Sequence, residues 1–234
     1  MNHLHDNINT YAVVLFTRIP IPGKTKTRLQ PFLTGEECCL LQKAFLLDIF
    51  NVLKEVKPGC DIIVCYSQEG PLDELSELLS AANFFFPQRE GTLGEKMHEI
   101  ICTALSIGYA RCLLIGSDLP LLKAHDVGGA YKLLDESDVV LCPTEDGGYY
   151  LVGMKEPCEE LFHLEEYGVS TVFERTVAAA EKAGKTCAEG VVTMDIDVPD
   201  DLFRLAERLK HEPDDVCPET RRVLGEILSK KGKL

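Results

Sequence analysis

The sequence lacks several features that would place it in large classes of proteins. No apolar run approaches the ~20 residues of a membrane-spanning helix, and the ten cysteines include no Cys-x-x-Cys pair. We therefore expect no membrane span, and reduced, mostly buried thiols instead of a disulfide framework. Residues 1–7 are polar and the apolar run after them is too short for a signal peptide, which predicts a cytoplasmic protein.

Positive charge is also scarce. The chain has 24 Lys and Arg against 38 Asp and Glu, so its formal net charge is −14 at pH 7. Nucleic acids and anionic membranes both require a cationic surface, so neither is expected as a partner. Any anionic ligand must be bound by a local group of cations.

Two common phosphate-binding motifs are missing as well. No Gly-x-Gly-x-x-Gly follows the first apolar run, which argues against a classical dinucleotide dehydrogenase. Gly23-Lys24-Thr25 resembles the end of a P-loop, but Arg18 stands where the first glycine of that motif belongs. A P-loop kinase is therefore not expected either.

What is present is the composition of an ordinary globular protein, 45% hydrophobic and 26% charged. A chain of 234 residues can bury a full core, and we expect one domain over residues 1–234. Strand-like runs alternate with helical segments, which predicts an α/β fold with right-handed crossovers, a mainly parallel sheet and helices on both faces. The expected strands cover residues 11–17, 61–67, 83–86, 111–115, 138–142 and 149–154, with a last one ending near Asp195, and the expected helices cover residues 35–56, 72–81, 94–107, 125–135, 169–183, 199–210 and 219–230.

The turn Asp146-Gly147-Gly148 joins two strand-like runs closely enough to form a hairpin. Residues 149–154 should therefore run antiparallel, which makes the sheet mixed. The structural reading is that the glycines supply positive φ. The functional alternative is that Gly147 and Gly148 let an acceptor or sugar lie against the backbone while Asp146 holds a hydroxyl.

The loop after the first strand, residues 18–30, is basic in an otherwise acidic chain. It holds Arg18, Lys24, Lys26 and Arg28, and no Asp or Glu occurs between Asp6 and Glu36. Ligands of open α/β sheets collect beyond the carboxyl ends of the strands. Arg offers forked hydrogen bonds and Lys a point charge, so this loop favours a di- or triphosphate over a merely solvated surface.

A second loop, Gly116-Ser117-Asp118-Leu119-Pro120, directly follows the expected strand 111–115. A carboxylate at a strand end, beside a glycine that admits close approach, is well placed to bind a hard cation. A carboxylate 4 Å from a phosphate oxygen would be repelled by ~4 kcal/mol at an effective dielectric constant of 20. Mg²⁺ or Mn²⁺ would convert that repulsion into a bridge, so Asp118 is the predicted metal ligand.

A second acidic cluster precedes the expected helix 199–210. Pro199 suits the first helical position, which leaves Val198 at the cap and Asp197 just outside the helix. Asp197 is therefore either a second metal or substrate contact or part of a local turn. Along a strand, Asp195 would point to the same side, so either carboxylate could be the ligand.

Together, these segments resemble GT-A-type nucleotide-diphospho-sugar transferases, and within them a bacterial family of glycosyltransferase-like proteins, some assigned to arsenosugar biosynthesis. The matching stretches are residues 16–18, 22–29, 91–97, 116–120, 146–151 and 195–202. The Lys-Thr-Arg-Leu stretch is also similar to that of the 2-phospholactate guanylyltransferases, which are nucleotidyltransferases of the same fold. The resemblance implies a three-layer α/β/α sandwich that uses Mg²⁺ or Mn²⁺.

The resemblance also implies roles for individual residues. Asp118 takes the place of the metal-binding aspartate of an Asp-x-Asp motif, with Asp197 nearby, and Lys24 and Arg28 would share the phosphate charge during catalysis. The residues implied in nucleotide binding are Thr17, Arg18, Gly23, Lys24, Arg28, Gly94 and Ser117.

The sequence departs from its relatives at several points. Thr92 stands where they usually carry Asp, Lys96 replaces a common Arg, and the Leu-x-Gly-Gly start of many nucleotidyltransferases is absent. The last absence favours glycosyl transfer from a nucleotide sugar to a small hydroxylated acceptor positioned by Asp146. The alternatives are nucleotidyl transfer from a nucleoside triphosphate to a phosphorylated acceptor, and a non-catalytic nucleotide-binding module.

Overall fold

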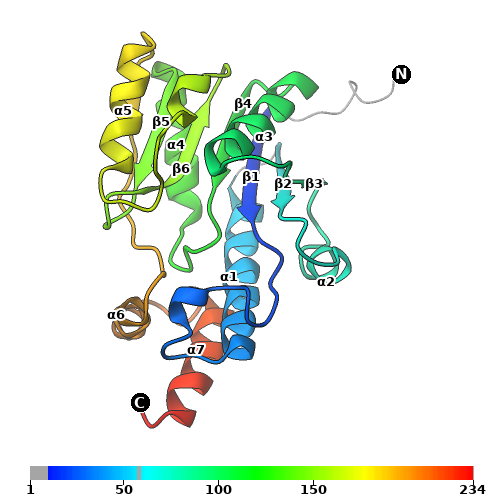
Figure 1. Cartoon of the computed structure of the whole chain (residues 1–234), viewed down its shortest axis with the longest axis vertical. Helices are drawn as coiled ribbons and strands as arrows, with labels where there is room; N and C mark the ends of the chain where they lie inside the picture. Colours follow the sequence, from blue (N-terminus) through cyan, green and yellow to red (C-terminus); the bar gives the residue numbers. More distant parts are fainter. Residues whose placement is uncertain (1–9, 57–58, 234) are drawn as a thin grey trace.

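The computed structural model describes residues 10–56 and 59–233, and its centre is a seven-stranded sheet with helices on both faces (Figure 1). The strand order is β3-β2-β1-β4-β6-β5-β7. Only β6 runs antiparallel to its neighbours, β4 and β5, and the other pairs are parallel. The expected α/β fold with a mixed, mainly parallel sheet is confirmed. Residues 1–7, whose polarity argued against a signal peptide, lie outside the described residues.

Strands and helices alternate along the chain as the sequence predicts. The strands are β1 (Tyr11–Thr17), β2 (Cys60–Tyr66), β3 (Phe84–Pro87), β4 (Arg111–Ile115), β5 (Val139–Pro143), β6 (Tyr149–Met154) and β7 (Cys187–Glu189). The helices are α1 (Gly35–Glu55), α2 (Asp73–Leu78), α3 (Leu93–Ile107), α4 (Ala124–Glu136), α5 (Val172–Lys182), α6 (Pro199–Leu209) and α7 (Pro218–Lys230), with the 3-10 turns η1 (Thr27–Leu29) and η2 (Glu159–Phe162).

Strand β1 shows why the sheet is covered on both faces. Its side chains alternate between two cores: Val13 and Leu15 pack with α1, α4 and α7, whereas Ala12 and Val14 pack with α3. All four are fully buried. A strand buried on both faces reads as a continuous apolar run, which is the pattern seen in the sequence.

Two helix starts agree closely with the sequence prediction: α3 begins at Leu93, one residue before the expected Gly94, and α6 begins at Pro199. Thr92 and Glu95 form a reciprocal capping box at the start of α3. Helix α6 has Val198 at its cap and Pro199 at its first position, as expected. These starts matter because both helices begin beside loops that carry candidate functional residues.

The last strand differs from the prediction. Strand β7 ends at Glu189, and only an isolated bridge between Thr144 and Thr193 follows it. Beyond Glu189, the N–H groups of Gly190 and Thr193 still donate to carbonyls of β5, and Ile196 N–H then donates to the carbonyl of Asp118. The prediction of a strand ending near Asp195 was therefore wrong. Alternation along a strand consequently does not orient the side chains of Asp195 and Asp197.

The hairpin between β5 and β6 is confirmed. Thr144 N–H donates to the carbonyl of Gly148 at 3.0 Å, and Gly147 has a φ of +91°, which only glycine adopts readily. Elsewhere in the described parts of the chain, no helix is long and apolar enough to cross a membrane. The ten cysteines all lie in the described residues, and none of them forms a disulfide bond there.

Candidate functional site

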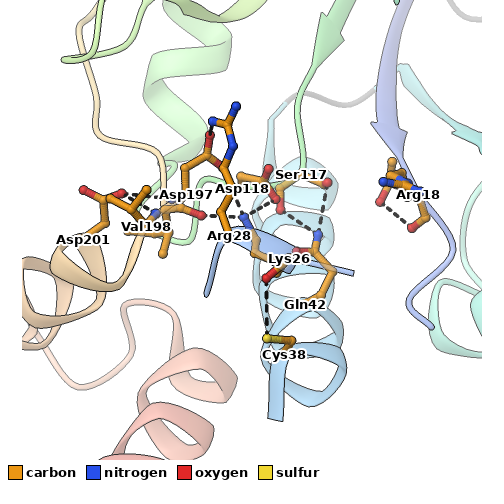
Figure 2. Close-up of polar contacts among 12 residues, drawn as sticks. Arg18, Lys26, Arg28, Cys38, Gln42, Ser117, Asp118, Asp197, Val198 and Asp201 are labelled. Atoms are coloured by element: carbon orange, nitrogen blue, oxygen red, sulfur yellow. Dashed lines mark hydrogen bonds and ion pairs between the residues drawn. The ribbon is translucent and has the colours of Figure 1, made fainter. Parts of the chain in front are cut away.

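Three loops meet at the carboxyl edge of the sheet, and the ammonium group of Lys26 lies at their junction (Figure 2). It is 2.7 Å from Oδ1 of Asp118 and 3.8 Å from Oδ1 of Asp197, and it also donates to the carbonyl of Ile196. The Lys26 side chain is only 4% exposed. One buried cation thus holds together the loops after β1, β4 and β7.

The basic loop folds back on itself to place Lys26. Ile21 N–H donates to Oγ1 of Thr25 at 2.7 Å, and Thr25 N–H donates to the Ile21 carbonyl at 3.1 Å. Lys26 then takes a left-handed conformation with a φ of +49°, which is uncommon for a residue with a side chain. Buried Leu29 anchors the 3-10 turn that follows. This conformation turns the Lys26 side chain inward, towards the β4 loop.

Asp118 is held by backbone contacts on both sides. Its own carbonyl accepts from Ile196 N–H at 3.0 Å. The amide nitrogen of Gln42, on α1, donates to both the carbonyl and the hydroxyl of Ser117 at 3.1 Å. The Asp118 carboxylate remains 41% exposed, so it is fixed in position and still accessible to a ligand.

Asp197 is positioned by the start of α6. Its N–H donates to Oδ2 of Asp201 at 3.0 Å, and Val198 N–H donates to the same oxygen at 2.9 Å. The Asp197 carboxylate faces Arg28, whose Nη1 is 3.5 Å from its Oδ2. The backbone of Asp197 therefore belongs to a local turn and its side chain lines the cavity described below, whereas its role as a metal or substrate contact stays a prediction.

Two adjoining cavities lie at this edge. The first, of about 220 Å³, is lined by basic and hydroxyl side chains together with the two carboxylates: Arg18, Thr25, Lys26, Thr27, Arg28, Gln42, Ser117, Asp118 and Asp197. The second, of about 500 Å³, shares Arg18, Ser117 and Asp118 with the first and extends between the ends of β1, β2 and β4 to the start of α3. Gln88, Leu93 and Tyr149 contribute to its walls.

The carboxylates of the site repel one another. Burial, followed by repulsion from Asp146, Asp197 and Asp118, raises the pKa of Asp195 to about 7. Burial and Asp118 also raise the pKa of Asp197, against the lowering effect of Lys26 and Arg28. Buried carboxylates with raised pKa values are typical of functional sites, and a cation bound beside them would lower those pKa values.

The structure brings some of the predicted residues together. Asp118, Asp197, Arg28, Arg18 and Ser117 all line the first cavity, and Thr17 lines the second. Arg18 lies apart from the others in Figure 2, where its guanidinium pairs with Glu69 at 2.6 Å.

Other predicted residues lie outside both cavities. Lys24 is exposed, and neighbouring Gly23 makes a turn whose carbonyl accepts from Gln30. Gly94 packs against the carbonyl of Phe162, which a Cβ would approach to 2.1 Å. None of the three lines either cavity.

The predicted acceptor turn also lies outside the two cavities. Oδ1 of Asp146 accepts from the Thr144 hydroxyl and, at 3.0 Å, from Gly148 N–H. At Gly147 an added Cβ would lie 2.0 Å from the Ser170 carbonyl. The interpretation of these residues as a hairpin turn therefore explains the contacts of the Asp146 carboxylate and the need for glycine at position 147. The acceptor role of Asp146, Gly147 and Gly148 stays a prediction.

Sequence reasoning passed over two residues of the site. The sequence places Lys26 in the basic loop, but the prediction assigned the phosphate contacts to Lys24 and Arg28. The position of Lys26 in the Lys-Thr-Arg-Leu stretch could have indicated that it belongs to the site. Gln42 shares a helix face with Cys38, Phe45 and Ile49, all of which are buried. A single amide on an apolar face was the signal for Gln42.

Comparisons with known proteins identify the family of the chain and related proteins. The model of the family described as "Uncharacterized protein conserved in bacteria (DUF2064)" matches residues 33–169. A 2-phospho-L-lactate guanylyltransferase of Methanocaldococcus vulcanius is 26% identical over 191 residues, which cover 81% of this chain and 82% of that protein. A 3-phospho-D-glycerate guanylyltransferase of Phenylobacterium zucineum is 28% identical over 188 residues, 77% of this chain and 84% of that one.

A solved structure is similar over nearly the whole chain. It is a crystal structure from Desulfovibrio desulfuricans G20, named as a nucleotide-diphospho-sugar transferase, with a TM-score of 0.86 and 26% identity. The similarity covers 95% of this chain and 98% of that chain. The seven-stranded sheet and its surrounding helices thus have a counterpart of known structure.

Proposed function

The chain belongs to the bacterial family DUF2064, and from that membership and the geometry of its site we propose a metal-dependent transferase that acts on a nucleotide-activated donor. One observation carries the proposal. The buried Lys26 ammonium joins Asp118 and Asp197 in a cavity that two arginines also line. The expected resemblance to nucleotide-diphospho-sugar transferases and to 2-phospholactate guanylyltransferases is confirmed.

The acidic pair fits a divalent cation that arrives with phosphates. Among residues 10–56 and 59–233, no group of three or more His, Cys, Asp or Glu side chains could hold a metal ion by itself. Asp118 and Asp197 nevertheless lie within ion-pair distance of one cation, Lys26. Mg²⁺ commonly takes one or two carboxylates and completes its shell with water and phosphate oxygens, and these two residues supply that number.

The residues of the cavity would divide the work of binding a polyphosphate. Lys26 and Arg28 would bind phosphate oxygens from one side, and the hydroxyls of Thr25, Thr27 and Ser117 line the same cavity. Asp118 and Asp197 would hold Mg²⁺ or Mn²⁺, which when bound would neutralise charge on the leaving group. The adjoining cavity, at the ends of β1 and β2, has room for the nucleoside.

Nucleotidyl transfer is the reaction we favour. The two relatives described above are named guanylyltransferases, and the substrates in their names, 2-phospho-L-lactate and 3-phospho-D-glycerate, are phosphorylated acids. By analogy, the donor here would be GTP and the acceptor a small phosphorylated acid. An acceptor phosphate is already ionised at pH 7 and needs no general base. Nucleotidyl transfer is thus placed before glycosyl transfer, whereas the missing Leu-x-Gly-Gly start had favoured glycosyl transfer.

Glycosyl transfer is the second candidate. The observation in its favour is the similarity over nearly the whole chain to a structure named as a nucleotide-diphospho-sugar transferase. A hydroxyl acceptor needs a base. Asp195 has a raised pKa, but a cation bound by Asp118 and Asp197 would lower it again. We therefore assign no base.

The experiment is an assay of both reactions with the same protein and Mn²⁺. Pyrophosphate release from GTP with 2-phospholactate or 3-phosphoglycerate is expected, and Asp118→Asn should reduce it about 100-fold or more. Release of a nucleoside diphosphate from a nucleotide sugar, without pyrophosphate from any triphosphate, would establish glycosyl transfer instead. A nucleotide that raises the melting temperature without turnover would indicate a binding module. If no nucleotide does so, the proposed function fails.

A further inference from the structure

Lys26 differs from the arginines of the basic loop because its charge is buried. Its side chain is 4% exposed, whereas those of Arg18 and Arg28 are 57% and 65% exposed. Its ammonium lies 5.5 Å from the ring centroid of Phe45 and donates to the carbonyl of Ile196. The lysine therefore makes contacts inside the protein that a purely phosphate-binding side chain would not need.

The carboxylates that Lys26 joins are the same two that would hold a divalent cation. A metal ion bound to Oδ1 of Asp118 and an ammonium 2.7 Å from that oxygen carry like charges and compete for the same lone pairs. The second contact, 3.8 Å to Oδ1 of Asp197, has the same conflict. Lys26 and the metal ion therefore cannot both occupy the position seen for the ammonium.

We propose that Lys26 is an internal cation that holds Asp118 and Asp197 together in the ligand-free protein and gives them up when a metal-bound nucleotide enters. The inference rests on the proposed metal and nucleotide site and adds a coupling between the two ligands. Lys26 leaves the carboxylates and binds phosphate oxygens in the same cavity. The carboxylates that it releases then bind the metal.

The surroundings of Lys26 allow this exchange by a movement of the side chain alone. The Lys26 backbone is anchored, because its carbonyl accepts from Leu29 N–H at 2.9 Å and from the Cys38 thiol at 3.5 Å. The hydroxyl-bearing Thr25 and Thr27 line the cavity on either side of it. The chain therefore need not refold to present the ammonium to a phosphate.

Gln42 supports a second position for a donor in this cavity. The residue is 4% exposed and lines the cavity, and its side-chain nitrogen donates to Ser117. Its oxygen is buried and has no hydrogen-bond partner in the described structure. A buried acceptor without a donor is unfavourable, so a donor that moves through the cavity would satisfy it.

The exchange makes the binding of metal and nucleotide cooperative. Each ligand alone must displace Lys26 from the carboxylates, whereas together they displace it once. A shared conformational cost of this kind gives positive coupling, and the coupling is reciprocal. The metal without nucleotide should therefore bind weakly to the natural protein because Lys26 competes with it.

The test is the affinity of the full chain for Mn²⁺ alone, measured by electron paramagnetic resonance of free Mn²⁺. Lys26→Met removes the competitor and should bind Mn²⁺ about tenfold more tightly than the natural protein. Lys210→Met is the matched control, because Lys210 is an exposed lysine that pairs with Glu207 on α6. It removes the same charge and should leave the affinity unchanged.

A Lys26→Met protein that binds Mn²⁺ no more tightly than the natural protein overturns the proposal. Acetylation of amines in the natural chain, followed by mass spectrometry, needs no variant: Lys26 should become more reactive when Mn²⁺ is added alone. Equal reactivity would also overturn it. If the variant fails but GTP still shifts the melting temperature in an Asp118-dependent manner, the proposed function stands. If both fail, the site itself is wrong.

Discussion

Burial, together with the charges of Asp118 and Asp146, raises the pKa of both Asp195 and Asp197 at the carboxyl edge of the sheet. At Asp197 the lowering effect of Lys26 exceeds the repulsion from Asp118, and burial is the main reason that the pKa of Asp197 stays raised. Such an arrangement lowers the stability of the free protein, and it is typical of sites that gain a cation on binding. The acidic cluster therefore lowers the free energy of unfolding of the ligand-free protein by a measurable amount.

Asp195→Asn should reveal that cost as a change in pH dependence. The pKa of Asp195 is raised in the folded protein from an ordinary value of 3.8 to about 7. The folded state thus binds the proton more tightly than the unfolded state, so the stabilising effect is present at low pH and is lost as the pH rises through 7. Asparagine carries no charge, so the variant should be more stable than the natural protein at pH 8.

The measurement is urea unfolding followed by circular dichroism between pH 4 and 8, because the chain has no tryptophan. The difference in free energy of unfolding between variant and natural protein should increase over that range. Asp200→Asn is the control, since Asp200 is exposed. A constant difference between Asp195→Asn and the natural protein would show that repulsion at Asp195 is not important.

Residue-level prediction from the sequence succeeded where a residue type and a position in the sheet sufficed. Asp118 follows an apolar strand, and Arg18 and Arg28 flank the basic loop, so their common location could be expected. The choice between Lys24 and Lys26 could not be made in that way. It depends on the left-handed backbone of Lys26 and the turn closed by Thr25, which are set by contacts within the loop.

Helix α6 connects the acidic loop to the hairpin on the other side of the site. Its first turn supplies Asp201, which binds the backbone of Asp197. Further along the helix, Arg204 and Arg208 both pair with Glu145. The helix therefore acts as a support that fixes the Asp197 backbone relative to the β5–β6 turn.

Asp201→Ala tests that support. The variant loses hydrogen bonds to the N–H groups of Asp197 and Val198, and loss of a helix cap of this kind costs about 1 kcal/mol. We expect that loss of stability together with a higher KM for the nucleotide. Asp200→Ala, at the neighbouring exposed position, should change stability by less than about 0.5 kcal/mol. Similar KM values for both variants would remove Asp201 from the site.

Gly94→Ala tests the packing of α3 against η2. The added methyl group would lie 2.1 Å from the carbonyl oxygen of Phe162, so the backbone must move. Overpacking of this kind typically costs about 1–3 kcal/mol. The matched control is Gly128→Ala on α4, where nothing lies within 4 Å of the new Cβ. This control should gain up to about 1 kcal/mol from helix propensity, as measured by urea unfolding.

At the scale of elements, the sequence predicted strands and helices well where periodicity was strong. The three strands β1, β4 and β6 have the predicted bounds, and the hairpin before β6 was read from its glycines. The end of β7 could not be predicted, because the backbone after Glu189 keeps only single bonds to β5, from Gly190 and Thr193, before Ile196 bonds to the loop of Asp118. The hydrophobic pattern of a segment does not show which neighbouring backbone its N–H and C=O groups will bond to.

At the scale of the whole molecule, the distribution of charge decides where an anionic ligand can bind. A net charge of −14 repels free nucleotides over most of the surface, while Arg18, Lys26 and Arg28 face a single cavity. The overall charge is unfavourable for binding nucleic acid, and the absence of such a partner stays a prediction. It also leaves the basic loop as the place where a polyphosphate meets complementary charge.

A single cooperative unfolding transition is expected if residues 1–234 form one domain, as we propose. The sheet continues from β3 to β7, and α7 packs on α1 in the core that also contains β1 and β4, so the ends of the chain should unfold together. Calorimetry should therefore give equal van't Hoff and calorimetric enthalpies. Two separable transitions, of which only one responds to GTP and Mn²⁺, would contradict the single domain.

The most direct test of the central claim is a crystal structure with Mn²⁺ and a non-hydrolysable GTP analogue, in which anomalous scattering locates the metal. The account predicts one Mn²⁺ about 2.2 Å from carboxylate oxygens of Asp118 and Asp197, bridged to phosphate oxygens that also contact Lys26 and Arg28. A metal peak away from Asp118, or a polyphosphate bound outside the cavity at the ends of β1 and β4, would contradict it.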